Sequence, residues 1–302
     1  MAYFVALDGG GTKTECWVAD ENSVLGRAST GSVKLMNVDE ATATSRLVEL
    51  VRAAAAEAGS ALGDVTRTCF GLAGSSSDAV RDWAVQTLRG VVGGEIIICG
   101  DEEIALDAAF HGGPGVLVIA GTGSNIVGRC ADGTMQTAGG WGPMLGDEGS
   151  GHWIGVEAIK SALRAQDRGV ETCMLKDIEG HWGLHSQGGL VAFANRRSRV
   201  EFAELTAVVA RCAEDGDALA ASVLERAGHE LAEQVSLVAS KMHHAGCAAT
   251  DALHVAYSGS VLAKISRVRK AMEEALRASM PGVEVAQSAV EPLEGALWKC
   301  RG

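Results

Sequence analysis

The sequence predicts an α/β protein made of two halves that share one order of strands and turns. In the first half, apolar strands near residues 5–7 and 15–19 flank a turn rich in glycine and threonine. The stretch from Val116 to Gly140 repeats that order, with an apolar strand, a Gly/Thr-rich turn, a second strand, an acidic turn and a third short strand. Two unrelated β-meanders could share this order, but glycine and threonine in the same turn favour a duplication.

Between the two copies, helical and strand patterns alternate, which is typical of a sheet with parallel members. Asp39 can cap a helix from about 40 to 58 that ends at Gly59. The other expected elements are a strand at 66–74, a helix at 78–88 and an apolar strand at 95–101. The Gly/Pro break at 110–115 is the best domain boundary, so we expect a small N-terminal domain at 1–113 and a larger one at 114–302.

The second half is rich in helices after Gly151. Helical spacing of apolar residues covers 153–168, 199–214 and 217–244, and a strand near 252–258 enters a Gly-Ser turn. The last helix, at about 291–301, has a proline near its start and could pack back on the N-terminal domain.

Composition excludes several classes of protein. Of 302 residues, 47% are hydrophobic and 21% charged, which is ordinary for a folded chain, and the net charge of -12 argues against nucleic acid as a partner. None of the eight cysteines forms a CxxC pair, so neither a zinc ribbon nor a thioredoxin motif is expected, and their apolar surroundings suggest free thiols in a reducing cytosol. Apolar runs are too short for a membrane span and no signal peptide is visible. We therefore expect a cytoplasmic protein without membrane contact.

The turn at 8–13 reads Asp-Gly-Gly-Gly-Thr-Lys. One interpretation is a tight hairpin, which needs glycine for positive φ. Three adjacent glycines exceed that need, and bare backbone beside hydroxyls can surround a phosphate oxygen. The spacing is neither that of a Walker A loop nor that of the dinucleotide fingerprint. The turn is thus predicted to bind phosphate by another scheme.

Asp101 follows the buried apolar strand at 95–99. A carboxylate at the carboxyl end of such a strand occupies the usual position for a site in α/β sheets, where it can act as a general base. The alternative is that Asp101 caps the helix beginning near Glu102. Both roles are compatible with the sequence.

Three strings together carry a family resemblance, namely DGGGTKT at 8–14, IAGTGSN at 119–125 and GGWGPMLGDEGSGHWIG at 139–155. The chain resembles the N-acetylglucosamine kinase and BadF-BadG-BcrA-BcrD-type ATPase family, within the actin/hexokinase/Hsp70 superfamily. The resemblance runs from about Phe4 to the C-terminus and is weakest at 167–205. It implies two duplicated ribonuclease H-like domains around a nucleotide cleft, with ATP and Mg²⁺ as cofactors.

The resemblance also implies which residues bind ATP. Asp8 would hold Mg²⁺ through water, as suits a hard ion that keeps most of its waters. The residues that would bind phosphate or adenosine are Gly9, Gly10, Gly11, Thr12, Lys13, Gly121, Thr122, Gly123, Gly259 and Ser260. For Gly259 and Ser260 taken alone, an ordinary turn is the alternative.

The sugar contacts implied by the resemblance come from several places. They are Asn37, Asp101 as the catalytic base, Thr122, Gly140, Trp141 and Asp147. The alternative for Trp141 is a buried core residue. Glu148 is expected to be structural, and His152, His243 and His244 are expected to be surface or core histidines rather than metal ligands.

The expected activity is phosphorylation of the 6-hydroxyl of an amino sugar by ATP, with N-acetylglucosamine as the leading substrate and a homodimer as the expected assembly. Glucosamine is the alternative substrate. Two other classes stay open: an ATPase activator of a dehydratase or reductase, which would need closely placed cysteines for an iron–sulfur cluster, and a sugar sensor without catalysis.

Overall fold

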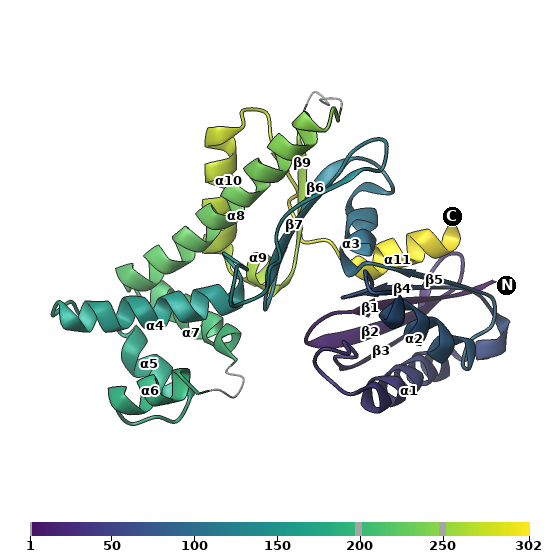
Figure 1. Cartoon of the computed structure of the whole chain (residues 1–302), viewed down its shortest axis with the longest axis horizontal. Coiled ribbons are helices and arrows are strands. Elements are labelled where there is room, and N and C mark those ends of the chain that lie inside the picture. Colours follow the sequence, from purple (N-terminus) through teal and green to yellow (C-terminus); the bar gives the residue numbers. More distant parts are fainter. Residues whose placement is uncertain (1, 197–200, 248–251) are drawn as a thin grey trace. The chain divides into compact units, whose positions relative to one another are not determined.

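The computed structural model describes residues 2–196, 201–247 and 252–302 (Figure 1). They form two compact units, Met1–Leu117 with Val290–Gly302, and Val118–Ala289. The expected helix at 199–214 is described only from residue 201 onward.

The first unit contains a five-stranded mixed sheet in the order β3-β2-β1-β4-β5. Its strands are β1 (Tyr3–Gly9), β2 (Lys13–Ala19), β3 (Val24–Gly31), β4 (Val65–Leu72) and β5 (Glu95–Cys99). Its helices are α1 (Glu40–Ala58), the short η1 (Leu62–Asp64), α2 (Asp78–Arg89), α3 (Asp101–Phe110) and α11 (Pro292–Arg301). The first three strands form an antiparallel meander, whereas β4 and β5 continue parallel to β1.

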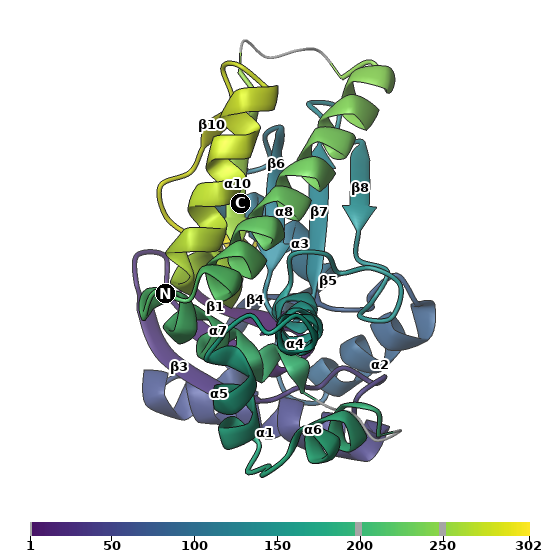
Figure 2. The ribbon, with the colours of Figure 1, turned by 90° about the vertical axis from the view of Figure 1, so that its left-hand side faces the viewer.

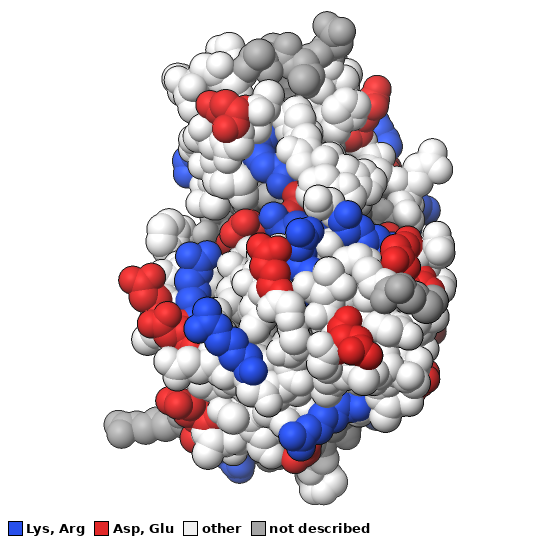
Figure 3. All heavy atoms as spheres, turned by 90° about the vertical axis from the view of Figure 1, so that its right-hand side faces the viewer, with Lys and Arg blue, Asp and Glu red and all other residues white. Residues whose placement is uncertain are grey.

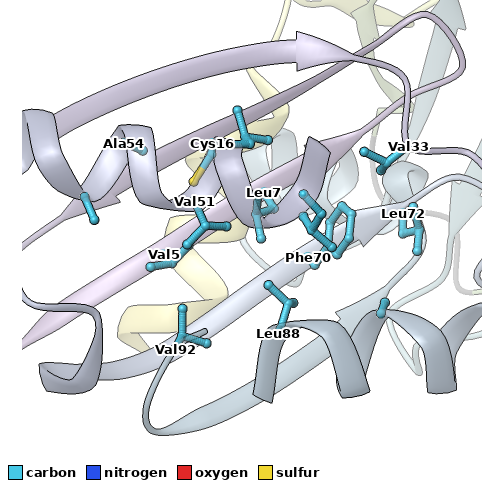
Figure 4. Close-up of a cluster of buried hydrophobic side chains, with 14 of the residues drawn as sticks. Val5, Leu7, Cys16, Val33, Val51, Ala54, Phe70, Leu72, Leu88 and Val92 are labelled. Carbon is cyan, nitrogen blue, oxygen red and sulfur yellow. The ribbon is translucent and has the colours of Figure 1, made fainter. Parts of the chain in front are cut away.

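One face of this sheet is covered by α1 and α2. Alternate residues of β1, including Val5 and Leu7, meet apolar side chains of the helices such as Val51 and Leu88 in a continuous buried cluster (Figure 4). The expected ends of α1 are confirmed, since Asp39 accepts a hydrogen bond from Thr42 N at 2.9 Å and Gly59 has a φ of 64°.

The other face of the sheet is covered by α3 and α11 (Figure 1). These two helices pack closely because Gly295 of α11 lies directly against the backbone of α3 at Ile104, where a Cβ would have no room. Lys299 Nζ lies 3.0 Å from the buried carboxylate of Asp107. The last helix therefore completes the first unit, although about 180 residues separate it from α3 in the chain.

The second unit has a five-stranded sheet in the order β10-β9-β6-β7-β8. Its strands are β6 (Gly115–Ala120), β7 (Ser124–Arg129), β8 (Met135–Gly139), β9 (His254–Ser258) and β10 (Glu284–Val285). When β6 is matched with β1, the order of strands is the same as in the first sheet. The duplication predicted from the sequence is thus confirmed.

Helices make up most of the rest of the second unit. They are α4 (Gly151–Asp167), α5 (Met174–His181), α6 (Gln187–Ala194), η2 (Phe202–Glu204), α7 (Leu205–Glu214), α8 (Ala218–His244), α9 (Ser260–Lys264) and α10 (Ser266–Ser279). The long helix α8 crosses β7 and β8 and lies beside α10, which it approaches through Gly228 (Figure 2). Helices α5 and α6 were not predicted.

One expectation about cysteine is wrong. Cys130, after β7, forms a disulfide with Cys247, after α8. The two residues are separated by 117 positions in the sequence, so no local spacing indicated the pair. Six other cysteines are free, and five of them are buried.

Among the described residues, no helix is both long and apolar enough to cross a membrane. Basic and acidic side chains are interspersed on the face drawn in Figure 3.

Candidate functional site

The glycine-rich turn between β1 and β2 is held by the segment that follows β3. Ser32 Oγ donates to Gly10 O at 2.9 Å, and the side-chain nitrogen Nδ2 of Asn37 donates to Gly11 O at 2.8 Å. Ser32 N also donates to Thr12 O at 3.1 Å. Since these bonds occupy carbonyl groups, the conformation of the turn is set within the first unit itself.

The structure gives Asn37 a definite position, at the turn and exposed to solvent. Its contact with sugar stays a prediction. The contact that the structure shows is the one with Gly11, so Asn37 supports the phosphate turn whether or not it also binds sugar.

Asp8 lies at the carboxyl end of β1, on the sheet face covered by α3 and α11. Glu15 is its direct partner across the β1–β2 pair, so both carboxylates lie on the same face. Glu291 is the N-cap of α11, and its side chain accepts a hydrogen bond from Leu293 N. Burial, together with the charges of Glu15 and Glu291, raises the pKa of Asp8 to about 7, while Lys13 opposes the shift.

Three carboxylates in one place repel one another, and the ion pair of Lys13 with Glu15 offsets only one of the three charges. Burial and Glu15 also raise the pKa of Glu291. Oxygen ligands of this kind suit Mg²⁺, which binds one or two carboxylates and keeps several waters. The sequence analysis identified Asp8 but missed Glu15 and Glu291, because only the pairing of strands and the return of α11 bring them to it.

Asp101 is the first residue of α3, and Gly100 is the N-cap. The capping contact is made by Glu103, whose carboxylate accepts from Gly100 N at 3.1 Å. No capping bond from Asp101 is found among the described residues. The alternative role as a helix cap therefore belongs to Glu103, and the carboxylate of Asp101 shares a side-chain hydrogen bond with Glu102 instead.

Asp101 and Asp8 lie at the same edge of the sheet. They follow the carboxyl ends of β5 and β1, which run parallel through β4. Next to Asp101, burial and a side-chain hydrogen bond with Asp101 raise the pKa of Glu102 to about 7. The edge thus gathers acidic groups on β1, β2, α3 and α11, all within the first unit.

In the second unit, the turn from Gly121 to Gly123 joins β6 to β7 and is held by the start of α4. Gly151 N donates to Gly121 O at 2.8 Å, and His152 N donates to Thr122 O at 3.1 Å. As in the first unit, the carbonyls of a Gly/Thr turn accept hydrogen bonds from a neighbouring segment. The two turns are thus alike in position and in how they are anchored.

The Gly259–Ser260 turn lies directly beside the turn at 121–123. Gly259 has a φ of 93°, and its Cα is so close to the backbone of Ala120 and Gly121 that a Cβ would stand 3.0 Å from Gly121 N. An ordinary turn would not require this approach. The structure therefore brings together the two motifs that the sequence analysis assigned to phosphate and adenosine in the second half.

Asp147 completes this group of motifs. It is only 6% exposed, has a φ of 60°, and accepts from Gly142 N at 3.1 Å. Its other oxygen packs on Gly123, where a Cβ would stand 2.7 Å away. The residue thus lies against the turn between β6 and β7 through its side chain.

Trp141 belongs to the loop that Asp147 supports. Its side chain is 75% exposed, so the alternative of a core tryptophan is wrong. Gly140 before it has a φ of 72° and packs against Asn125. Glu148 accepts from Gln234 at 3.2 Å, consistent with the structural role expected for it.

His152 lies nearer to the predicted phosphate-binding turn at 121–123 than the sequence analysis expected. It is half-buried at the start of α4 and packs edge-on against Phe202 at 5.2 Å. Burial lowers the pKa of His152, and the charges of Asp147 and Glu201 oppose this shift. His243 and His244 lie at the exposed end of α8, as expected.

We expect Gly259→Ala to lower the free energy of unfolding by about 2–4 kcal/mol, because the new Cβ meets backbone and φ is positive. Gly282→Ala is the matched control, since its φ of 92° is almost the same and no atom lies within 4 Å of the added Cβ. The control should lose about 1 kcal/mol. Urea denaturation measures both free energies of unfolding. If the two variants lose the same stability, the close contact of Gly259 with Ala120 does not affect stability.

Comparison with known proteins decides the family. The model of the BadF/BadG/BcrA/BcrD ATPase family matches residues 5–298. The chain belongs to this ATPase family. The resemblance noted in the sequence is thus confirmed, and the matched range includes both Gly/Thr turns and the first part of α11.

Two curated relatives and one solved structure are similar to the chain. An N-acetylmuramic acid/N-acetylglucosamine kinase of Clostridium acetobutylicum is 33% identical over 79% of each chain. The glucosamine kinase GspK of Vibrio cholerae is 26% identical over 82% of each chain. A candidate N-acetylglucosamine kinase from Chromobacterium violaceum superimposes with a TM-score of 0.76 at 25% identity, over 99% of each chain. The fold is therefore that of the actin/hexokinase-like ATPases.

Proposed function

We propose that this protein is an ATP-dependent sugar kinase that phosphorylates the 6-hydroxyl of N-acetylglucosamine. The observation that carries the proposal is the duplicated sheet, with an anchored Gly/Thr turn after the first strand of each copy and two carboxylates at the edge of the first sheet. The acceptor follows from the relatives, which are named as kinases of amino sugars.

In this proposal each unit has its own task. The backbone of the turn at 9–13 and that of the turn at 121–123 bind phosphate oxygens, and Gly259 with Ser260 binds adenosine. Asp101 accepts the proton of the sugar hydroxyl and aligns its oxygen with the γ-phosphorus, the usual role of a carboxylate in such transfers. Trp141 offers an exposed ring face to the sugar, and Asp147 accepts from a sugar hydroxyl.

The cluster of Asp8, Glu15 and Glu291 fits Mg²⁺, since its oxygens are hard ligands whose mutual repulsion a divalent cation relieves. Asp8 would hold the ion through water. When bound, the ion offsets charge on the phosphate oxygens.

The proposal includes a homodimer and a cytoplasmic location. Sedimentation of the purified chain tests whether it is a homodimer.

The decisive experiment measures ADP release with Mg-ATP against N-acetylglucosamine, N-acetylmuramic acid, glucosamine, N-acetylmannosamine, glucose and no sugar. We expect strong stimulation by N-acetylglucosamine, with the product phosphorylated at the 6-position by NMR. ATP turnover that no sugar stimulates would overturn the proposal.

Glucosamine is the second candidate substrate, and the glucosamine kinase of Vibrio cholerae favours it. The two sugars differ only at the 2-amino group. Stimulation by glucosamine but not by N-acetylglucosamine would replace the first candidate with the second.

A further inference from the structure

Two cysteines and two aspartates meet where three helices of the second unit come together, apart from the motifs assigned to ATP and sugar. Cys173 precedes α5, Asp177 is on α5, Cys212 is on α7 and Asp217 precedes α8. The thiols of the two cysteines and a carboxylate oxygen of Asp177 all lie within 4.8 Å of one another. Helices α5 and α7 pack together, as Figures 1 and 2 show.

The distances fit a tetrahedral ion. Zinc binds sulfur at about 2.3 Å and carboxylate oxygen at about 2.0–2.2 Å, so two of its ligands stand roughly 3.4–3.8 Å apart. Cys212 Sγ lies 3.6 Å from Asp177 Oδ2. Small movements of side chains would therefore suffice to close a coordination shell.

Asp217 orients the first cysteine. Its Oδ2 accepts from Cys173 N at 2.8 Å and lies 3.3 Å from Cys173 Sγ. Its Oδ1 accepts from Leu219 N and Ala220 N at the start of α8. These hydrogen bonds fix the position of the Asp217 carboxylate. It can therefore orient the Cys173 side chain, as groups next to metal ligands commonly do.

Charge and access agree with a divalent ion. Two thiolates and the carboxylates of Asp177 and Asp217 bring four negative charges, of which a divalent ion offsets two and the bonds from Thr172, Leu219 and Ala220 to Asp217 partly offset another. Arg211 Nη2, 3.4 Å from Asp177 Oδ2, offsets the charge of Asp177. Cys212 is buried but Cys173 is partly exposed, so an ion can enter from solvent.

We propose that Cys173 Sγ, Cys212 Sγ and Asp177 Oδ2 bind one Zn²⁺ ion, with water in the fourth position. Thiolate ligands favour zinc over Mg²⁺ and Ca²⁺, which take oxygen ligands. Binding forms two zinc–sulfur bonds and releases the two thiol protons to solvent. The ion would link α5 to α7. Helix α6, which follows α5, buries only Leu190, so the segment of α5 and α6 is weakly packed and the link would stabilise it.

The test uses the full chain, with its thiols reduced and metal removed by a chelator that is then dialysed away. Titration with Co²⁺ should give one ion per chain, a thiolate-to-cobalt charge-transfer band and the visible bands of tetrahedral cobalt. One equivalent of Zn²⁺ should abolish these bands. Zinc at about 100-fold excess over its Kd should raise Tm by roughly 5–10 °C.

Variants locate the site. Cys173→Ser should weaken binding at least about 100-fold and reduce the charge-transfer band, and since Cys173 is partly exposed this variant should fold. Asp177→Asn should weaken binding while the band remains. Asp215→Asn, an exposed neighbour in the same turn, and Cys300→Ala, in the first unit, are controls that should bind normally.

Three results would each overturn the proposal. The first is no stoichiometric binding to the reduced chain. The second is binding that survives in Cys173→Ser but is lost in Cys300→Ala. The third is a disulfide between Cys173 and Cys212, found by peptide mapping, that persists under the reducing conditions used for the titration. None of these readouts depends on kinase activity.

Discussion

Asp101→Asn is expected to lower kcat by about 10²–10⁴-fold while the protein stays folded. The asparagine keeps the shape of the side chain but cannot accept the hydroxyl proton. Because Glu103 and not Asp101 caps α3, the substitution leaves the helix start intact. Steady-state ADP release with the preferred amino sugar measures the effect, and circular dichroism with thermal melting checks the fold.

Glu103→Gln is the matched control, two residues further along the same helix. It weakens the capping contact with Gly100 N, so it should cost about 0.5–1 kcal/mol of stability and leave kcat within a few-fold of the parent value. If Asp101→Asn turns over at a near-normal rate, Asp101 is not the base. Glu102, whose pKa is raised to about 7 beside it, would then be the next residue to test.

Asp8→Asn is expected to produce a protein that is more stable but less active. Its kcat/KM for Mg-ATP should fall by about 10–100-fold, the usual loss when a group that orients a metal's ligands is removed. At pH 8 its free energy of unfolding should rise, on the order of 1–4 kcal/mol, because the variant no longer buries a charge beside Glu15 and Glu291.

The two pKa values of Asp8, in the folded and the unfolded chain, determine how stability changes with pH. Asp8 has a pKa of about 7 in the folded chain and 3.8 as its ordinary value, so the folded chain holds more protons between those limits. Stability therefore falls as pH rises from about 4 to 7, and the penalty is complete above pH 7. Denaturation of both proteins at pH 4, pH 5 and pH 8 should show the variant's advantage growing with pH, small at pH 4, partial at pH 5 and complete at pH 8.

Binding of Mg-ATP should show the opposite trend, because the ion favours ionised Asp8. Affinity should increase as pH rises through 7, and the difference between the parent and Asp8→Asn isolates this contribution from the titration of ATP itself. Asp82→Asn, an exposed change on α2, serves as the control that should alter neither property. A parent and variant with identical pH profiles would remove Asp8 from the metal site.

Much of the fold could be predicted from the sequence because its signals are local. The glycine and threonine turns after β1 and β6, the cap of α1 and the alternation of strands and helices each depend on a few neighbouring residues. The strand order in the two sheets confirms the duplication that these signals indicated. The family resemblance depended on the same short strings, and the family match over residues 5–298 confirms it.

The sequence by itself thus determined the two-fold repeated α/β pattern and most of the residues proposed to bind ATP and sugar. Only the tertiary structure decided which distant groups accompany them: Glu15 and Glu291 beside Asp8, Asp107 paired with Lys299, and Cys130 bonded to Cys247. It also brought Cys173, before α5, next to Cys212 of α7. Such contacts join segments that are far apart in the chain, and they depend on strand register and helix packing, for which no short stretch of sequence carries a signal.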